Sequence, residues 1–227
     1  MSTALMYSFA QRSDTRVLDE PLYGHFLRRS GAERPDRQAT LAVWPSTAER
    51  ALEAMRPTQQ EISGNRHLFC KHIANHLDGL PWDAFEGGKH VLLFRDPAAV
   101  MASYGVHIER PMMRDLCYSH QLALLKRLEA AGETPIVVCS DRLQSSPEPT
   151  LRALCSALDL EWNPAVLQWE AGPRPEDGPW APWWYGGVHR STGWEARATA
   201  EHSVPPELDD LYRGCLEAYT QLLQYAL

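Results

Sequence analysis

Short apolar runs alternate with longer amphipathic stretches along the chain. The clearest run is Val91–Phe94, which has no polar interruption, and a similar run lies within 135–139. Uninterrupted apolar runs of this length are typical of parallel strands that are covered on both faces. Two further strands are predicted over 16–18 and 67–73. We therefore expect four short strands separated by helices.

The stretches between these runs repeat apolar residues at helical spacing. At the N-terminus, Ser2 or Thr3 is expected to cap a helix over 4–11. Helices are also predicted over 22–29 and 46–55, and apolar stripes at 113–128 and 151–158 indicate two more. The most regular pattern ends the chain and consists of Leu208, Leu211, Tyr212, Cys215, Tyr219, Leu222 and Leu223.

This order of elements predicts an α/β fold with a mainly parallel sheet flanked by helices. The chain has 227 residues and no visible linker, so we expect a single domain over 1–227. Ligands of such folds bind beyond the carboxyl ends of the strands. The candidate site residues are therefore the pairs that follow the strands: Asp19–Glu20, Lys71–His72, Arg95–Asp96 and Ser140–Asp141.

Composition narrows the choice of partners. The net charge is −7, from 22 basic and 29 acidic residues, which argues against a nucleic-acid-binding protein. No apolar run approaches the ~20 residues of a membrane helix, and no secretory signal is visible. Five scattered cysteines without CxxC spacing suggest neither a disulfide framework nor a zinc site. We expect a cytoplasmic protein with no membrane partner.

The segment after the clearest strand is a candidate anion site. Arg95 lies at the strand end, Pro97 favours the first turn of a helix, and Ser103 follows two turns later. A guanidinium there offers a planar pair of donors to a phosphate, and the serine hydroxyl could add a third. The alternative is a surface pair of Arg95 with Asp96 that only ends the strand.

The other strand ends supply candidate acid–base groups. Glu20 is the first candidate for a general base, with His25 as an alternative. Glu20 could instead only stabilise a helix N-terminus. Lys71 could neutralise a bound anion, and His72 could line the cleft. His72 and His76 share helical spacing, but two histidines alone indicate no metal site, and no metal is expected.

The segment His90–Tyr104, with Arg-Asp-Pro after a strand and a serine eight residues after the arginine, resembles the 3′-phosphate-binding segment of sulfotransferases. The resemblance implies a three-layer fold like that of P-loop NTPases and a 3′-phosphoadenosine 5′-phosphosulfate (PAPS) co-substrate held by Arg95 and Ser103. More narrowly, the chain is similar to bacterial sulfotransferase-like proteins. It begins where the family's 5′-phosphosulfate loop ends, so we expect only the hydroxyls of Ser2 and Thr3 from that loop, and no first, central strand.

The resemblance also implies a role for segment 169–194, which is rich in Pro, Gly and Trp. In the family a basic, glycine-containing loop closes the 3′-phosphate pocket, and Arg190, Ser191 and Gly193 fit this role. We expect the aromatic segment to cover the nucleotide or acceptor site. The implied function is transfer of a sulfuryl group from PAPS to a hydroxyl or amine of a small molecule. The alternatives are a non-catalytic nucleotide-binding relative and an ATP-dependent phosphotransferase of the same fold.

Overall fold

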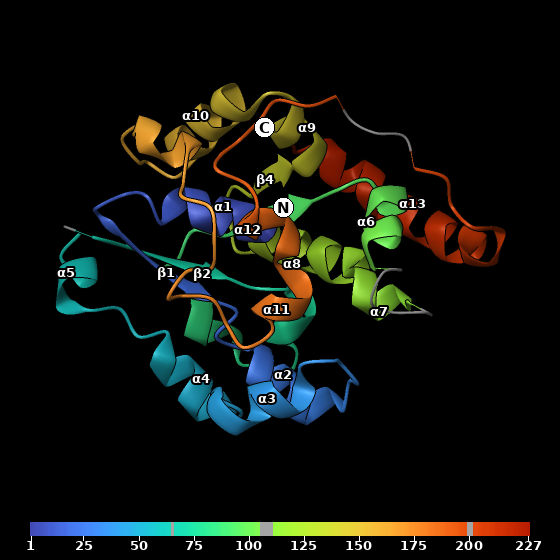
Figure 1. Cartoon of the computed structure of the whole chain (residues 1–227), viewed down its shortest axis with the longest axis horizontal. Coiled ribbons are helices and arrows are strands. Elements are labelled where there is room, and N and C mark those ends of the chain that lie inside the picture. The colour runs from blue at the N-terminus through green and yellow to red at the C-terminus, as the bar shows by residue number, and fades with distance from the viewer. Residues whose placement is uncertain (65, 105–110, 199–201) are drawn as a thin grey trace. The chain divides into compact units, whose positions relative to one another are not determined.

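The computed structural model describes residues 1–64, 66–104, 111–198 and 202–227 (Figure 1). These residues form two compact units, each built from two separate parts of the chain. Unit 1 contains residues 1–86 and 163–194, and unit 2 contains 87–162 and 195–227. Within the described residues, no helix is both long and apolar enough to cross a membrane.

Unit 1 is built on a parallel pair of strands, β1 (Thr15–Asp19) and β2 (His67–Lys71). The register places Asp19 opposite Lys71 at the carboxyl ends of both strands. Helix α1 (Ser2–Phe9) packs against both strands and buries every residue from Leu5 to Phe9. The pairing therefore brings an acidic and a basic side chain together at one end of a buried sheet.

The remaining elements of unit 1 before residue 87 are short. Gly24 permits close packing of the first of them, because a Cβ at this position would lie 2.4 Å from the Pro45 carbonyl oxygen. The Thr47 side chain caps the helix that begins at Ala48. Thr58 and Glu61 form a capping box on the helix that begins at Gln59. The elements are α2 (Tyr23–Ser30), α3 (Arg37–Val43), α4 (Ala48–Ala54), α5 (Gln59–Ile62) and the 3₁₀ turns η1 (Ala74–Leu77) and η2 (Trp82–Phe85).

The aromatic segment 169–194 also belongs to unit 1. It follows the 3₁₀ turn η3 (Pro164–Leu167) and contains two short helices, α11 (Ala181–Trp184) and α12 (Gly186–His189). Its two ends meet at an antiparallel bridge between Gln168 and Gly193. The segment is therefore a closed, ordered loop with its own hydrogen bonds.

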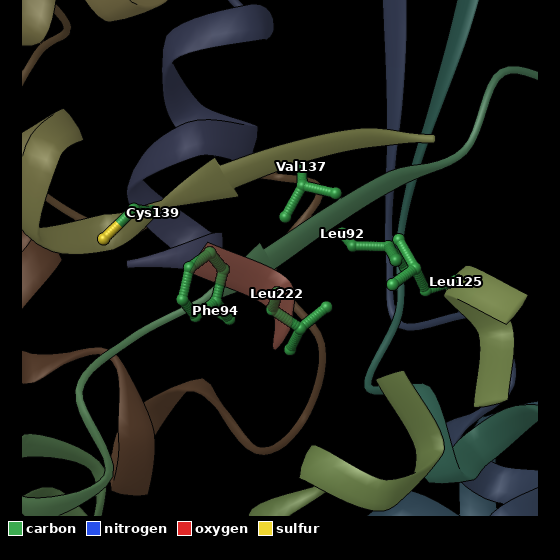
Figure 2. Close-up of a cluster of buried hydrophobic side chains, with 6 residues drawn as sticks. All are labelled: Leu92, Phe94, Leu125, Val137, Cys139 and Leu222. Carbon is green, nitrogen blue, oxygen red and sulfur yellow. The ribbon is translucent and has the colours of Figure 1, made fainter. Parts of the chain in front are cut away.

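Unit 2 contains the second parallel pair, β3 (Val91–Phe94) and β4 (Ile136–Cys139). Figure 2 shows side chains of these strands facing the C-terminal helix α13 (Asp209–Leu223). Leu222 on that helix is fully buried in this cluster. The cluster consists of Leu92, Phe94, Leu125, Val137, Cys139 and Leu222. Non-local packing of strands against the last helix thus stabilises this unit.

Five helices and a 3₁₀ turn complete what is described of unit 2, and the first of these helices begins two residues after Arg95. That helix is α6 (Pro97–Tyr104). The predicted stripe over 113–128 is divided into two helices, because Cys117 adopts a left-handed conformation with φ of 62°. The other elements are α7 (Met113–Leu116), α8 (Tyr118–Ala130), α9 (Ser140–Ser145), α10 (Pro147–Ala157) and η4 (Pro206–Leu208).

The structure confirms four parallel-paired strands and the C-terminal helix. The predicted range of the first helix was wrong, because the helix spans Ser2–Phe9 instead of 4–11. Met1 occupies the cap position, so neither Ser2 nor Thr3 caps this helix, and both lie inside its first turn. The three-layer arrangement and the single domain over 1–227 stay predictions.

Candidate functional site

A buried ammonium group lies at the carboxyl end of the sheet in unit 1. The Lys71 side chain is 3% exposed, and its Nζ donates hydrogen bonds to Asp19 Oδ1 at 2.9 Å and Glu20 Oε1 at 2.6 Å. A third bond from Nζ goes to the Tyr185 hydroxyl oxygen. A buried charge is tolerated only with such partners. We call these four side chains the Lys71 network.

Tyr185 connects the aromatic segment to this network. Its hydroxyl group is 2.7 Å from Asp19 Oδ2 and accepts a hydrogen bond from Trp180 Nε1 at 2.8 Å. The backbone N–H of Gly178 donates to the same Asp19 oxygen at 3.0 Å. Asp19 therefore joins β1 to two points of segment 169–194, Gly178 and Tyr185, and the segment is anchored at the predicted site.

Backbone strain coincides with the network. Glu20 has a φ of 41°, a left-handed conformation that is unfavourable for a residue with a side chain. Its N–H donates to the Lys71 carbonyl at 3.0 Å, and its own carbonyl accepts from Trp44 Nε1 at 3.1 Å. These bonds hold the peptide in place. The conformation turns the chain so that two consecutive carboxylates both reach Lys71.

Burial and the close charges shift the pKa values of the network. Burial raises the pKa of the Glu20 carboxyl, more strongly than the Lys71 charge lowers it. Burial opposes the charge of Lys71, but Glu20, Tyr185 and Asp19 together raise the pKa of the ammonium well above its usual value. Burial also raises the pKa of the Tyr185 hydroxyl well above 10. The charged form of Lys71 is thus favoured over the neutral amine.

The predicted anion segment lies in unit 2. Arg95 directly follows β3; its side chain is 35% exposed and its Nε lies 3.8 Å from Asp141 Oδ1. Its carbonyl accepts a hydrogen bond from the Tyr118 hydroxyl at 2.6 Å, which fixes the backbone. Ser103 is exposed on α6. Arg95 does not pair with Asp96, whose carboxylate instead caps α6 through the N–H groups of residues 98 and 99.

The three candidate residues of the aromatic segment, Arg190, Ser191 and Gly193, differ in whether a side chain is exposed to a ligand. Arg190 is exposed, whereas the Ser191 hydroxyl donates to the Val188 carbonyl at 2.7 Å and accepts from the Trp169 indole at 3.1 Å. Gly193 has a packing role, because a Cβ there would lie 2.6 Å from the Leu167 carbonyl oxygen. Arg190 is therefore the residue of this trio with a side chain directed to solvent.

A second polar cluster holds the aromatic segment on α1. The Tyr7 hydroxyl donates to Asp177 Oδ2 at 2.7 Å, and His189 Nε2 lies 3.0 Å from the same oxygen. The rings of Tyr7 and His189 stack with centroids 6.4 Å apart. Tyr7 also contacts the buried ring of Trp169. The aromatic residues thus attach the segment to the body of unit 1.

The structure brings Glu20, Lys71 and the neighbouring His72 together in unit 1. Ser2 and Thr3 lie in the first turn of α1 in the same unit, while Arg95 and Ser103 lie in unit 2. Their convergence on one ligand stays a prediction. Sequence reasoning missed the roles of Asp19 and Tyr185. The position of Asp19 directly after a predicted strand was a usable signal for the first; no local pattern marks the second.

Parallel strands that end in paired acidic and basic residues define the class: an α/β protein whose polar groups follow the carboxyl ends of its strands. The chain belongs to the sulfotransferase domain family, which matches residues 1–226. It is 38% identical, over 223 residues and 98% of its length, to branched-chain-amino-acid aminotransferase-like protein 1 of Arabidopsis thaliana. It is 38% identical over 226 residues to protein 2 of the same name and organism. The chain spans about two fifths of these relatives, 40% and 39%.

Proposed function

We propose that the chain transfers a sulfuryl group from PAPS to a hydroxyl or amine of a small molecule, without a metal, in the cytoplasm. The family match over residues 1–226 carries this proposal. In the reaction, the acceptor oxygen or nitrogen attacks sulfur, the bond from sulfur to the bridging phosphate oxygen breaks, and adenosine 3′,5′-bisphosphate leaves. The three-layer P-loop-like fold over one domain belongs to the same proposal.

The Arg95 segment would bind the 3′-phosphate. Among the described residues, the ion-pair partner of this half-exposed guanidinium is Asp141 at the long distance of 3.8 Å, which leaves donor atoms for a ligand. Because Asp96 already occupies N–H groups at the start of α6, the side chains of Arg95 and Ser103 would make the contacts. Arg190, with Ser191 and Gly193 shaping its loop, would close the pocket. The first turn of α1, with Ser2 and Thr3, would face the 5′ side.

His72 is the favoured acceptor for the proton that leaves the nucleophile. The Glu20 side chain is 10% exposed and already bound to Lys71, so it is poorly placed to meet a substrate. His72 directly follows β2 and is half-buried, and histidine is the most common general base. In this proposal Lys71 and Glu20 hold the end of the sheet in shape and set its charge.

Calorimetric titration of the full chain with adenosine 3′,5′-bisphosphate tests the nucleotide site. Arg95→Ala should weaken binding about 10- to 100-fold, since hydrogen bonds to charged groups contribute roughly 1.5–3 kcal/mol. Arg213→Ala, which removes an exposed guanidinium from α13, is the matched control and should bind normally. Equal affinity of the Arg95 variant and the wild type would contradict the assignment. Tighter binding of ATP with Mg²⁺ would favour a phosphotransferase.

A further inference from the structure

His76 is buried against the Lys71 network in an orientation fixed by two rings. It is 4% exposed and stacks on Tyr23 and Phe26, with centroids 5.1 Å and 4.4 Å apart. Its Nδ1 has no hydrogen-bond partner in the part of the chain that the structure describes. This nitrogen lies 3.8 Å from Glu20 Oε2. A polar atom that is buried in this way requires a partner.

The charges of the network leave one position open for a proton. Two carboxylates, Asp19 and Glu20, share the single positive charge of Lys71. Asp19 accepts from Lys71, Tyr185 and a backbone N–H, the pattern of a carboxylate with satisfied oxygens. Glu20 uses Oε1 for Lys71, while Oε2 faces His76. With Glu20 ionised, the buried group would carry one unmatched negative charge, which is costly.

We propose that Glu20 and His76 share one titratable proton and that His76 is thereby a positioning residue, which sets the net charge of the Lys71 network. Uptake of one proton from water changes that net charge from −1 to zero. On the function proposed above, the consequence is that an anionic nucleotide binds more tightly when the pair holds its proton.

The surroundings decide which atom carries the proton. Burial, followed by the charges of His72, Lys71 and Arg34, lowers the pKa of His76 well below its usual value. Burial raises the pKa of Glu20, and Asp19 and Asp36 contribute in the same direction. The proton therefore resides on Glu20 Oε2, and the neutral imidazole accepts it. Movement of these atoms from 3.8 Å into hydrogen-bonding distance completes the pair.

Side-chain ¹⁵N NMR of the full chain tests the pair without any ligand. His76→Gln assigns the resonance, and the Nδ1 shift of His76 is then followed from pH 5 to pH 9. We expect a pH-dependent shift in the wild type that is lost in Glu20→Gln. Glu20→Asp, a second variant in case the first does not fold, should move the midpoint by about one pH unit, a tenfold change in proton affinity. Superimposable curves in wild type and variant would overturn the proposal.

Two controls separate the pair from general effects and from the proposed function. Glu49→Gln removes an exposed carboxylate on α4 that acts on His25, so it should leave the His76 curve unchanged. In calorimetry, wild-type affinity for adenosine 3′,5′-bisphosphate should fall about tenfold as the pair loses its proton. His76→Phe removes the acceptor of that proton and should move the midpoint of this pH dependence to lower pH. An unchanged pH dependence in His76→Phe would contradict the inference. No bisphosphate binding at any pH would instead refute the proposed function while leaving the NMR result intact.

Discussion

Removal of one hydroxyl group from the Lys71 network should destabilise the chain measurably. In Tyr185→Phe, three buried groups lose a partner: the ammonium of Lys71, the carboxylate of Asp19 and the indole N–H of Trp180. The ring stays and leaves no large cavity. A hydrogen bond to a charged group contributes roughly 1.5–3 kcal/mol, and the three groups relax together, so we expect a loss of about 2–4 kcal/mol.

Urea unfolding of the full chain measures this loss. With a slope of about 2 kcal/mol/M, the unfolding midpoint should fall by about 1–2 M while the slope stays constant. Tyr212→Phe, which removes a hydroxyl from a half-buried ring on α13, should change stability by less than about 0.5 kcal/mol. A Tyr185→Phe midpoint within error of the wild type would refute the reasoning.

A double-mutant cycle shows whether the network acts as a unit. Lys71→Met alone should cost about 3–5 kcal/mol, because it leaves two buried carboxylates without their cation. Once Lys71 is replaced, Tyr185→Phe should cost clearly less than it does in the wild type, since the two groups contact each other. Strict additivity would mean that the two side chains stabilise the chain independently.

Three further predictions concern other parts of the chain. Leu222→Ala should cost about 2–5 kcal/mol in urea unfolding, since this side chain is fully buried against both strands of unit 2; a cost below about 1 kcal/mol would contradict the packing in Figure 2. The hydrogen-bonded Arg16 guanidinium lowers the pKa of Glu61 to about 2, so the ion pair should add about 1 kcal/mol above the ordinary pKa of glutamate, and this should be lost as the pH falls through about 2. Arg16→Met and wild type should therefore differ at pH 7 and converge near pH 2; a constant difference would exclude the pair as its source. Burial raises the pKa of Cys70 to about 12, so iodoacetamide at pH 8 should alkylate it roughly 1,000-fold more slowly than free cysteine, whereas a rate within tenfold of free cysteine would show that the thiol is accessible and ionised.

A feature could be predicted from the sequence when the residues whose interactions produce it lie close together in the chain. Val91–Phe94 and the strand that pairs with it were predictable because four consecutive apolar side chains need a buried strand. The start of α1 was predicted wrongly, because hydroxyl residues near a helix start resemble a cap even when they lie inside the first turn and Met1 occupies the cap position. Local sequence patterns therefore locate helices and strands more accurately than they locate the first and last residues of these elements.

Prediction of the candidate site was limited in the same way, because local patterns do not show contacts between distant residues. Glu20 and Lys71 were identified from their positions after strands, and they do meet. Tyr185 was not, since its partners lie 114 and 166 residues away in the sequence. The left-handed backbone of Glu20 could not be predicted either, because it depends on a hydrogen bond from Trp44 to the Glu20 carbonyl and on one from the Glu20 N–H to the carbonyl of Lys71. Contacts of this length depend on the whole fold.

The division of each unit between two stretches of the chain has a consequence for biosynthesis. Residues 1–86 emerge from the ribosome before the part that completes their unit, 163–194, which follows only after most of unit 2. Until Tyr185 has been synthesised, the ammonium of Lys71 lacks one of its three partners. We therefore expect unit 1 to fold late and slowly, because its contacts join distant parts of the chain, and to expose apolar surface in the meantime. We expect nascent chains that are stalled before residue 178 to be far more sensitive to protease over 1–86 than chains that extend past 194.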